Sequence, residues 1–121
     1  MPVSDTAAPP RLRLRILFGD DAMLGPGKAE LLEHIRQTGS ISAAGRAMGM
    51  SYKRAWMLVE EMNASFRDAL VESARGGAGG GGAQLTAAGE AVLALYGRVE
   101  TAAAEAGAKE IAALRSMLCD M

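Results

Sequence analysis

The side chains best suited to chemistry in this 121-residue chain stand in one short run. Ser51 and Tyr52 can hydrogen-bond a phosphate or a base edge. Lys53 can neutralise a phosphate, and Arg54 can pair bidentately with a guanine. Residues 40–59 contain three basic residues and no acidic one, although the whole chain carries a net charge of −1. This local excess of positive charge predicts a contact with duplex DNA.

Further candidate DNA contacts flank this run. Trp56 and Met57 follow it and lie mostly off the stripe that should face the core, while Ser42 and Arg46 precede it. Arg75 stands at the base of a glycine-rich segment, from which it can enter a minor groove or hold the backbone. Each has a plainer interpretation, because aromatic side chains can pack on the scaffold and an arginine can simply face water.

Other kinds of chemistry lack the residues they need. The one histidine, His34, and the one cysteine, Cys119, are far apart in sequence, and no carboxylate pair or metal-ligand spacing occurs. We therefore expect no catalytic site, no metal site and no cofactor. A single thiol cannot form an internal disulfide, which fits the reducing cytoplasm. No apolar run approaches the roughly 20 residues that a membrane span requires.

The elements around the basic run follow the spacing of a helix-turn-helix motif. Ser42 is expected to cap a short helix over residues 43–48, and Gly49 ends it. Ser51 then caps a longer helix that runs to about Phe66. In this motif the second helix presents its first turns to the major groove. The predicted reading helix thus carries the basic run at its leading end.

A strand and a helix are expected before this motif. Residues 11–18 alternate between apolar and basic side chains, which is typical of a half-buried strand. Residues 19–27 are rich in turn formers and are expected to be a connection. Pro26 suits the start of a helix, residues 28–38 place apolar side chains on one helical stripe, and Gly39 ends that helix.

A hairpin is expected after the motif. Residues 69–73 and 83–85 can be strands, and residues 75–82 (RGGAGGGG) form a loose glycine-rich tip between them. The order of elements predicts a mainly α chain with a small antiparallel sheet, a winged helix-turn-helix. We assign residues 1–10 to a disordered arm, 11–85 to the DNA-binding domain and 86–121 to long C-terminal dimerisation helices.

The C-terminal region carries more apolar helix than a small domain needs for its own core. Thr86 caps it, and Gly107 divides it into two helices. An apolar stripe at helical spacing is the expected surface for a second copy. Its candidate members are Val92, Leu95, Tyr96, Val99, Ala103, Ile111 and Leu114.

Several of these stretches resemble the N-terminal domain of the ModE family of molybdate-responsive bacterial transcription regulators, whose helix-turn-helix is akin to that of LysR-type regulators. The similar stretches are residues 24–28 (LGPGK), 39–44 (GSISAA), 50–56 (MSYKRAW), 61–63 (EMN) and 85–89 (LTAAG). The resemblance covers about residues 11–106. It implies a winged-helix homodimer on a palindromic operator that controls genes for molybdenum uptake or molybdoenzymes, with residues 51–62 as the reading helix.

One departure from the family limits what the resemblance implies. The family carries its molybdate sensor in a C-terminal domain of small β-barrels, and this chain ends before such a domain could begin. Nothing in the sequence offers an oxyanion pocket, so we expect a single-domain form that does not bind molybdate directly. The acidic overall balance leaves open an alternative, a winged-helix module that binds another protein instead of DNA.

Overall fold

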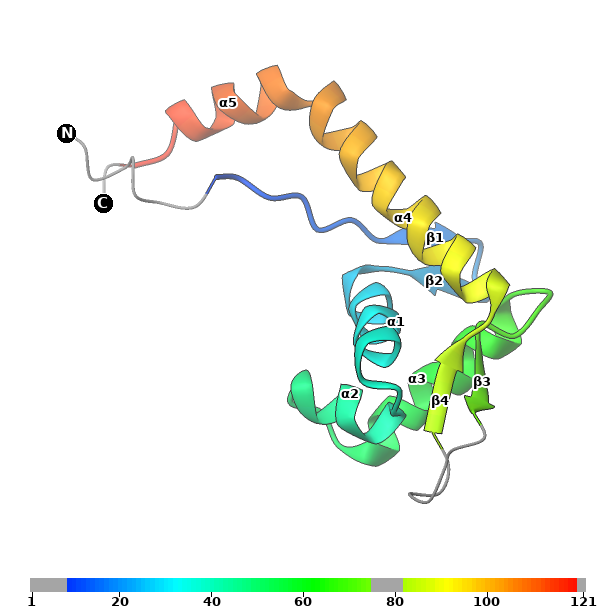
Figure 1. The fold of residues 1–121 in the computed structure, drawn as a ribbon. Coiled ribbons are helices and arrows are strands. Elements are labelled where there is room, and N and C mark those ends of the chain that lie inside the picture. Colours follow the sequence, from blue (N-terminus) through cyan, green and yellow to red (C-terminus); the bar gives the residue numbers. More distant parts are fainter. Residues whose placement is uncertain (1–8, 75–81, 120–121) are drawn as a thin grey trace.

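Three helices and a hairpin surround the apolar core, and the two C-terminal helices extend away from it (Figure 1). The computed structural model describes residues 9–74 and 82–119. The predicted disordered arm, residues 1–10, therefore lies almost wholly outside the described residues. In chain order the elements are β1 Ile16–Phe18, β2 Ala22–Leu24, α1 Pro26–Thr38, α2 Ile41–Ala47, α3 Tyr52–Ser65, β3 Val71–Ala74, β4 Gly82–Leu85, α4 Ala87–Ala106 and α5 Ala108–Ser116.

Helix α1 is the centre of the core. It begins at Pro26, as predicted, because a proline at the first helical position has no N–H to leave unpaired. Leu31, Leu32 and Ile35 are fully buried. Gly39 ends the helix at φ 70°, and its N–H donates to the Ile35 carbonyl, as predicted.

The helix-turn-helix consists of α2 and α3, with one correction to the predicted start of α2. Ser40, not Ser42, caps α2, since its hydroxyl accepts a bond from the Ala43 N–H. The helix begins two residues early because Ile41 is buried in the core. Gly49 ends the motif's first helix at φ 72°, as predicted. A Cβ on Gly45 would lie 3.0 Å from that of Ala55, so the two helices cross at close range.

The N-terminal strand is shorter than predicted, and the connection after it contains a second strand. β1 pairs antiparallel with β2, with Ile16 opposite Leu24. Residues 11–15 have no partner strand, yet their burial alternates as predicted: Leu12 and Leu14 are half-buried and the arginines are exposed. Phe18 departs from the predicted apolar face, since 51% of its surface is exposed. Residues 19–27 are therefore partly a strand, not only a connection.

The wing is built from β3 and β4, which pair antiparallel from Val71 opposite Leu85 to Ala74 opposite Gly82. β3 starts two residues later than predicted. The Ala83 N–H donates to the Gly39 carbonyl at 2.9 Å, which ties β4 to the end of α1. Gly82, which was predicted to lie in the glycine-rich tip, is the first residue of β4, and the rest of the predicted tip, residues 75–81, lies outside the described residues.

Helices α4 and α5 follow the predicted division at Gly107. The Thr86 hydroxyl caps α4 by accepting from the Gly89 N–H at 3.0 Å. α4 packs on α1 near its start, and Tyr96 donates a hydrogen bond to the Leu14 carbonyl. Farther along, α4 and α5 leave the core as an arm (Figure 1). Within the described residues, no helix is both long and apolar enough to cross a bilayer.

Candidate nucleic-acid interface

The leading end of α3 projects from the core. Ser51 caps it, because its hydroxyl accepts from the Arg54 N–H at 3.0 Å. Tyr52, Lys53 and Arg54 are all exposed, while the next residue, Ala55, is fully buried. The first turn of a helix has N–H groups without helical partners, which favour an anion such as a phosphate. Polar side chains and backbone donors therefore face solvent together here.

The aromatic residues of α3 divide between solvent and core. Tyr52 is 59% exposed, whereas Trp56 is half-buried and packs against the core. Their rings meet edge to face, with centroids 6.1 Å apart. Met57 is 44% exposed. Trp56 thus supports the position of Tyr52 and has only part of its own surface free for DNA.

In the described part of the chain, the three basic residues of α2 and α3 have no carboxylate partner. Within residues 9–74 and 82–119, Arg46, Lys53 and Arg54 form no ion pair. Arg46 donates instead to the Ser42 hydroxyl at 3.0 Å, one turn earlier on α2. An unpaired cation on an exposed surface can meet a phosphate without first losing a protein partner. Arg75 lies outside the described residues.

A groove runs between α3 and the wing. Hydroxyl groups line it from three elements: Ser42 on α2, Tyr52 on α3 and Ser73 on β3. Glu72, also in the lining, is engaged by the Gln84 amide at 2.9 Å across the wing. The groove is therefore rich in neutral hydrogen-bonding groups, the kind that contact a nucleic-acid backbone.

Asn63 also lines this groove, and the candidate contacts predicted from sequence did not include it. Its carboxamide bonds to the backbone of Leu70 and Val71, eight residues or fewer along the chain. An asparagine on a polar helix face carries no periodic signal. Its partners become visible only when the base of the wing is placed beside α3.

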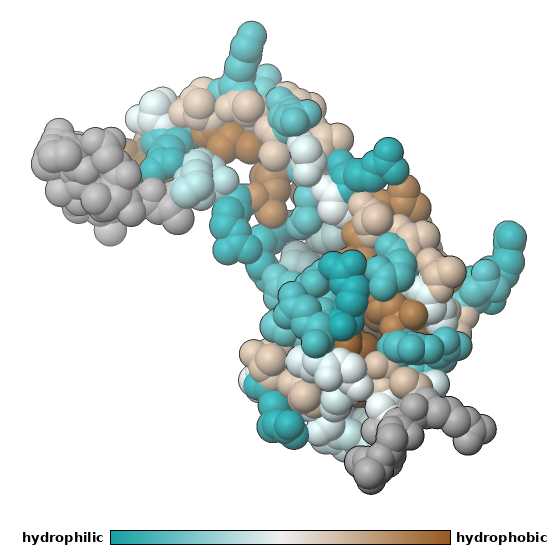
Figure 2. Space-filling view, in the orientation of Figure 1, coloured by the Kyte–Doolittle hydropathy of each residue, from teal (hydrophilic) through white to brown (hydrophobic). Residues whose placement is uncertain are grey.

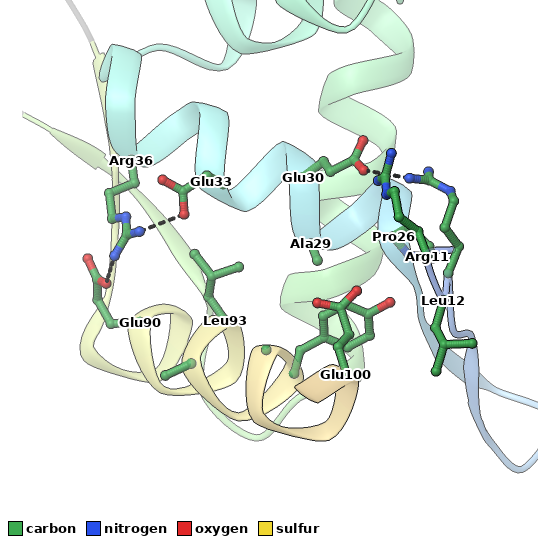
Figure 3. A pocket seen from close by; sticks show the side chains of 14 residues that line it. Arg11, Leu12, Pro26, Ala29, Glu30, Glu33, Arg36, Glu90, Leu93 and Glu100 are labelled. Carbon is green, nitrogen blue, oxygen red and sulfur yellow. Dashed lines mark hydrogen bonds and ion pairs between the residues drawn. The ribbon is translucent and has the colours of Figure 1, made fainter. Parts of the chain in front are cut away.

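A second hollow lies between α1, α4 and the N-terminal segment (Figure 3). Its charged groups largely pair with one another: Arg36 bonds to Glu33 and to Glu90, the latter at 3.1 Å. The bond with Glu33 raises the pKa of Arg36 above its ordinary value. Burial, followed by the charge of Glu100, raises the pKa of Tyr96. This mutual pairing makes the second hollow a weaker candidate for anion binding than the α3 surface.

The candidate dimerisation residues occupy different environments. Leu95 and Val99 on α4 are 56% and 42% exposed, and Leu114 on α5 is 64% exposed. Tyr96 is only 3% exposed and packs inside this chain. The remaining candidates, Val92, Ala103 and Ile111, are half-buried. Apolar side chains lie along α4 and α5 (Figure 2).

Other functional groups are sparse. Within the described ranges, no group of three or more His, Cys, Asp or Glu side chains could hold a metal ion. Cys119 is exposed and unpaired.

Comparison with known proteins agrees with this geometry. Residues 27–90 match the family model described as "Bacterial regulatory helix-turn-helix protein, lysR family". Among solved structures, "Crystal structure of CbnR_DBD-DNA complex" is similar with a TM-score of 0.57 and 23% identity, covering 73% of this chain and 95% of that chain. This likeness shows the winged-helix fold predicted from the sequence.

The relatives also confirm the predicted resemblance to ModE. The chain is 48% identical over 90 residues to the molybdenum-pterin-binding protein MopB of Rhodobacter capsulatus, covering 74% of this chain and 33% of that protein. It is 48% identical over 80 residues to the DNA-binding transcriptional dual regulator ModE of Escherichia coli (strain K12), covering 66% of this chain and 29% of that protein. The chain thus spans about a third of the length of these curated relatives. With more than half of its residues matched by the family model, the chain belongs to the lysR family of bacterial regulatory helix-turn-helix proteins, a family of DNA-binding regulators and not of enzymes.

Proposed function

We propose that this protein is a sequence-specific transcription regulator that binds a palindromic operator as a homodimer. The observation that carries the proposal is the exposed first turn of α3, where Lys53 and Arg54 have no acidic partner. A helix of this diameter fits the major groove, and its first turns reach the base edges. Arg54 would read a base, and Lys53 would hold a phosphate.

Genes for molybdenum uptake or molybdoenzymes are the proposed targets. Support comes from the names of the relatives, several of which are called ModE or molybdenum transport protein. The similarity covers the region that carries the helix-turn-helix. A regulator of bacterial genes works where the chromosome is, so we place the protein in the cytoplasm.

Pairing of two copies through α4 and α5 is the second part of the proposal. Leu95, Val99 and Leu114 expose apolar surface that a partner helix would cover. A two-fold dimer presents two copies of α3 to two half-sites, which is why its operator would be palindromic. Tyr96, packed inside its own chain, is left out of the proposed pairing surface.

Selection of duplexes from a random-sequence pool by the purified protein tests the proposal. A palindromic motif should emerge, and Arg54→Ala should weaken binding to it by more than about tenfold, since a bidentate arginine–guanine pair contributes about 1–3 kcal/mol. Lys53→Ala should weaken binding to all duplexes alike. Genomic footprinting should then place the motif near molybdenum genes, with and without molybdate in the medium.

Arg67→Ala is the matched control, because Arg67 is an exposed cation just beyond the far end of α3. It removes the same charge and should leave the affinity within about twofold. If Arg54→Ala binds the selected duplex as tightly as the unmodified protein, α3 is not the reading helix. Failure to enrich any duplex, with a protein partner recovered instead, would favour an interaction module.

A further inference from the structure

We propose that Asn63 is a positioning residue for DNA binding, which holds the wing and α4 in a fixed orientation relative to the reading helix. Its Oδ1 accepts from the N–H groups of Leu70 and Val71 at 2.8 and 3.1 Å. Its Nδ2 donates to the Val71 carbonyl at 3.0 Å. One side chain on α3 thus makes three bonds to the backbone at the base of the wing. The effect on DNA rests on the proposed function; the positioning itself does not.

Leu70 continues this connection to α4. Its side chain is fully buried, and its carbonyl accepts from the Thr86 N–H at 2.9 Å, at the cap of α4. The Thr86 hydroxyl in turn donates to the Ala69 carbonyl at 2.6 Å. A Cβ on Gly89 would lie 2.2 Å from the Leu70 carbonyl oxygen, so the first turn of α4 sits directly against it. Leu70 is therefore bonded through its N–H to α3 and through its carbonyl to the start of α4.

On the side of α3, the backbone that Asn63 holds follows a segment without regular structure. Residues 66–69 between α3 and β3 form no helix or strand. Asn63 is half-buried, so water can reach the Leu70 and Val71 amides once the carboxamide is removed. The buried side chains of Leu70 and Val71 would keep the region folded. Loss of Asn63 should therefore loosen the orientation of the wing and α4 relative to α3 without unfolding the core.

A fixed angle between α3 and the wing matters because both elements must contact one duplex at the same time. If the two elements are oriented before binding, less conformational entropy is lost when the complex forms. The direction of α4 matters in the same way, since it sets where a second copy places its own α3. Asn63 acts on both through Leu70.

Distance measurements on the DNA-free protein test the positioning. Spin labels are attached at Met57→Cys on α3 and Thr101→Cys on α4 in a Cys119→Ser background, all three positions being exposed. Labelled chains are diluted into unlabelled ones, so that only distances within one chain are measured. Asn63→Ala should broaden or shift the distance distribution. Ser65→Ala, which removes only a hydroxyl bond to the Glu61 carbonyl of the same helix, should leave it unchanged.

DNA affinity is then measured by fluorescence anisotropy on the duplex that the unmodified protein selects. The measurement is made at a temperature where circular dichroism shows every variant folded. Asn63→Ala should bind at least about tenfold more weakly, given three lost bonds, and Ser65→Ala within about twofold. Asn63→Asp keeps an acceptor for both amides but loses the Nδ2 donor to the Val71 carbonyl, so it should broaden the distance distribution less than Asn63→Ala does, and this distance measurement replaces that of Asn63→Ala if the alanine variant does not fold.

The outcomes separate the two proposals. An unchanged distance distribution in Asn63→Ala overturns the positioning role whatever happens on DNA. A broadened distribution with unchanged affinity overturns the role in DNA binding. If the unmodified protein selects no duplex, the proposed function fails, while the distances still decide whether Asn63 orients α3 against α4.

Discussion

At the scale of single residues, Gly89 is the position where the fold leaves least room. Any side chain there would meet the Leu70 carbonyl oxygen at 2.2 Å, and that oxygen is held by the Thr86 N–H. Gly89→Ala should lower the free energy of unfolding by about 1–3 kcal/mol, the range typical of an overpacked core. Urea denaturation measures this loss.

Gly97 is the matched control in the same helix. A Cβ there would have no neighbour within 4 Å, so Gly97→Ala should raise the free energy of unfolding by about 0.5–1 kcal/mol through backbone entropy. Equal destabilisation by the two substitutions would contradict the close approach of α4 to Leu70. The contrast shows why a glycine's importance depends on its neighbours and not on its presence in a helix.

Tyr96 gives the protein a predicted response to alkaline pH. Burial, and secondarily Glu100, raises its pKa in the folded state above the unfolded value of about 10. The folded state therefore holds the proton longer, and the free energy of unfolding should be steady below about pH 9 and fall as the pH rises through the folded pKa. Tyr96→Phe should lose about 1 kcal/mol at neutral pH, with the bond to the Leu14 carbonyl, and should flatten the alkaline fall. Thermal melts from pH 7 to 11 measure both effects.

At the scale of elements, substitutions of Ser51 can separate its role as the cap of α3 from the effect of this helix end on DNA binding. Ser51→Ala should destabilise the fold by about 1 kcal/mol, because the Arg54 N–H loses its acceptor. Ser51→Asp supplies another good capping group, so its stability should match the unmodified protein within a few tenths of a kcal/mol. Its carboxylate would nevertheless face the phosphates and should weaken DNA binding by more than about tenfold. A Ser51→Asp variant that binds DNA normally would mean that this end of α3 does not face the duplex.

The elements that could be predicted from sequence are those specified by local signals. Helices α1, α3 and α4 each have a cap, an end signal or an apolar stripe, and the structure has each one close to its predicted bounds. β2 could not be predicted in this way, because its three residues include no β-branched side chain and pair only with β1. For α2, two serines compete as caps, and the choice depends on the burial of Ile41 in the core.

The residues of the candidate site also include some that could be predicted from sequence and some that could not. Ser51 to Arg54 could be predicted, since their types and order alone suit a phosphate or a base. Asn63 could not, because its partners lie across a tertiary contact. Periodicity also cannot distinguish a side chain that packs in its own chain from one that meets a partner. Tyr96 and Leu95 are neighbours in sequence, yet they are 3% and 56% exposed.

At the scale of the whole molecule, the reading helix and the proposed pairing surface belong to different parts of the chain. α3 lies at the core, whereas the exposed apolar residues of α4 and α5 lie along the arm (Figure 1). A dimer built through the arm would fix the separation of its two reading helices by way of α4, Leu70 and Asn63. Contacts far from DNA would then determine which half-site spacing is bound.

The pairing surface yields the last prediction. Leu95 and Val99 are four residues apart on α4, so they share one helix face, and both are exposed. Leu95→Glu with Val99→Glu should convert the protein from dimer to monomer in sedimentation analysis, because two carboxylates would have to lose water at the interface. Thr101→Glu, an exposed position on another side of α4, should leave the dimer intact.

The monomer that carries the two glutamates should keep its helical content but bind a two-half-site operator far more weakly than the unmodified protein does. Its affinity should be close to that for a single half-site, because the second reading helix no longer binds at high effective concentration. A monomeric unmodified protein, or a double variant that remains dimeric, would show that α4 does not pair the copies in this way.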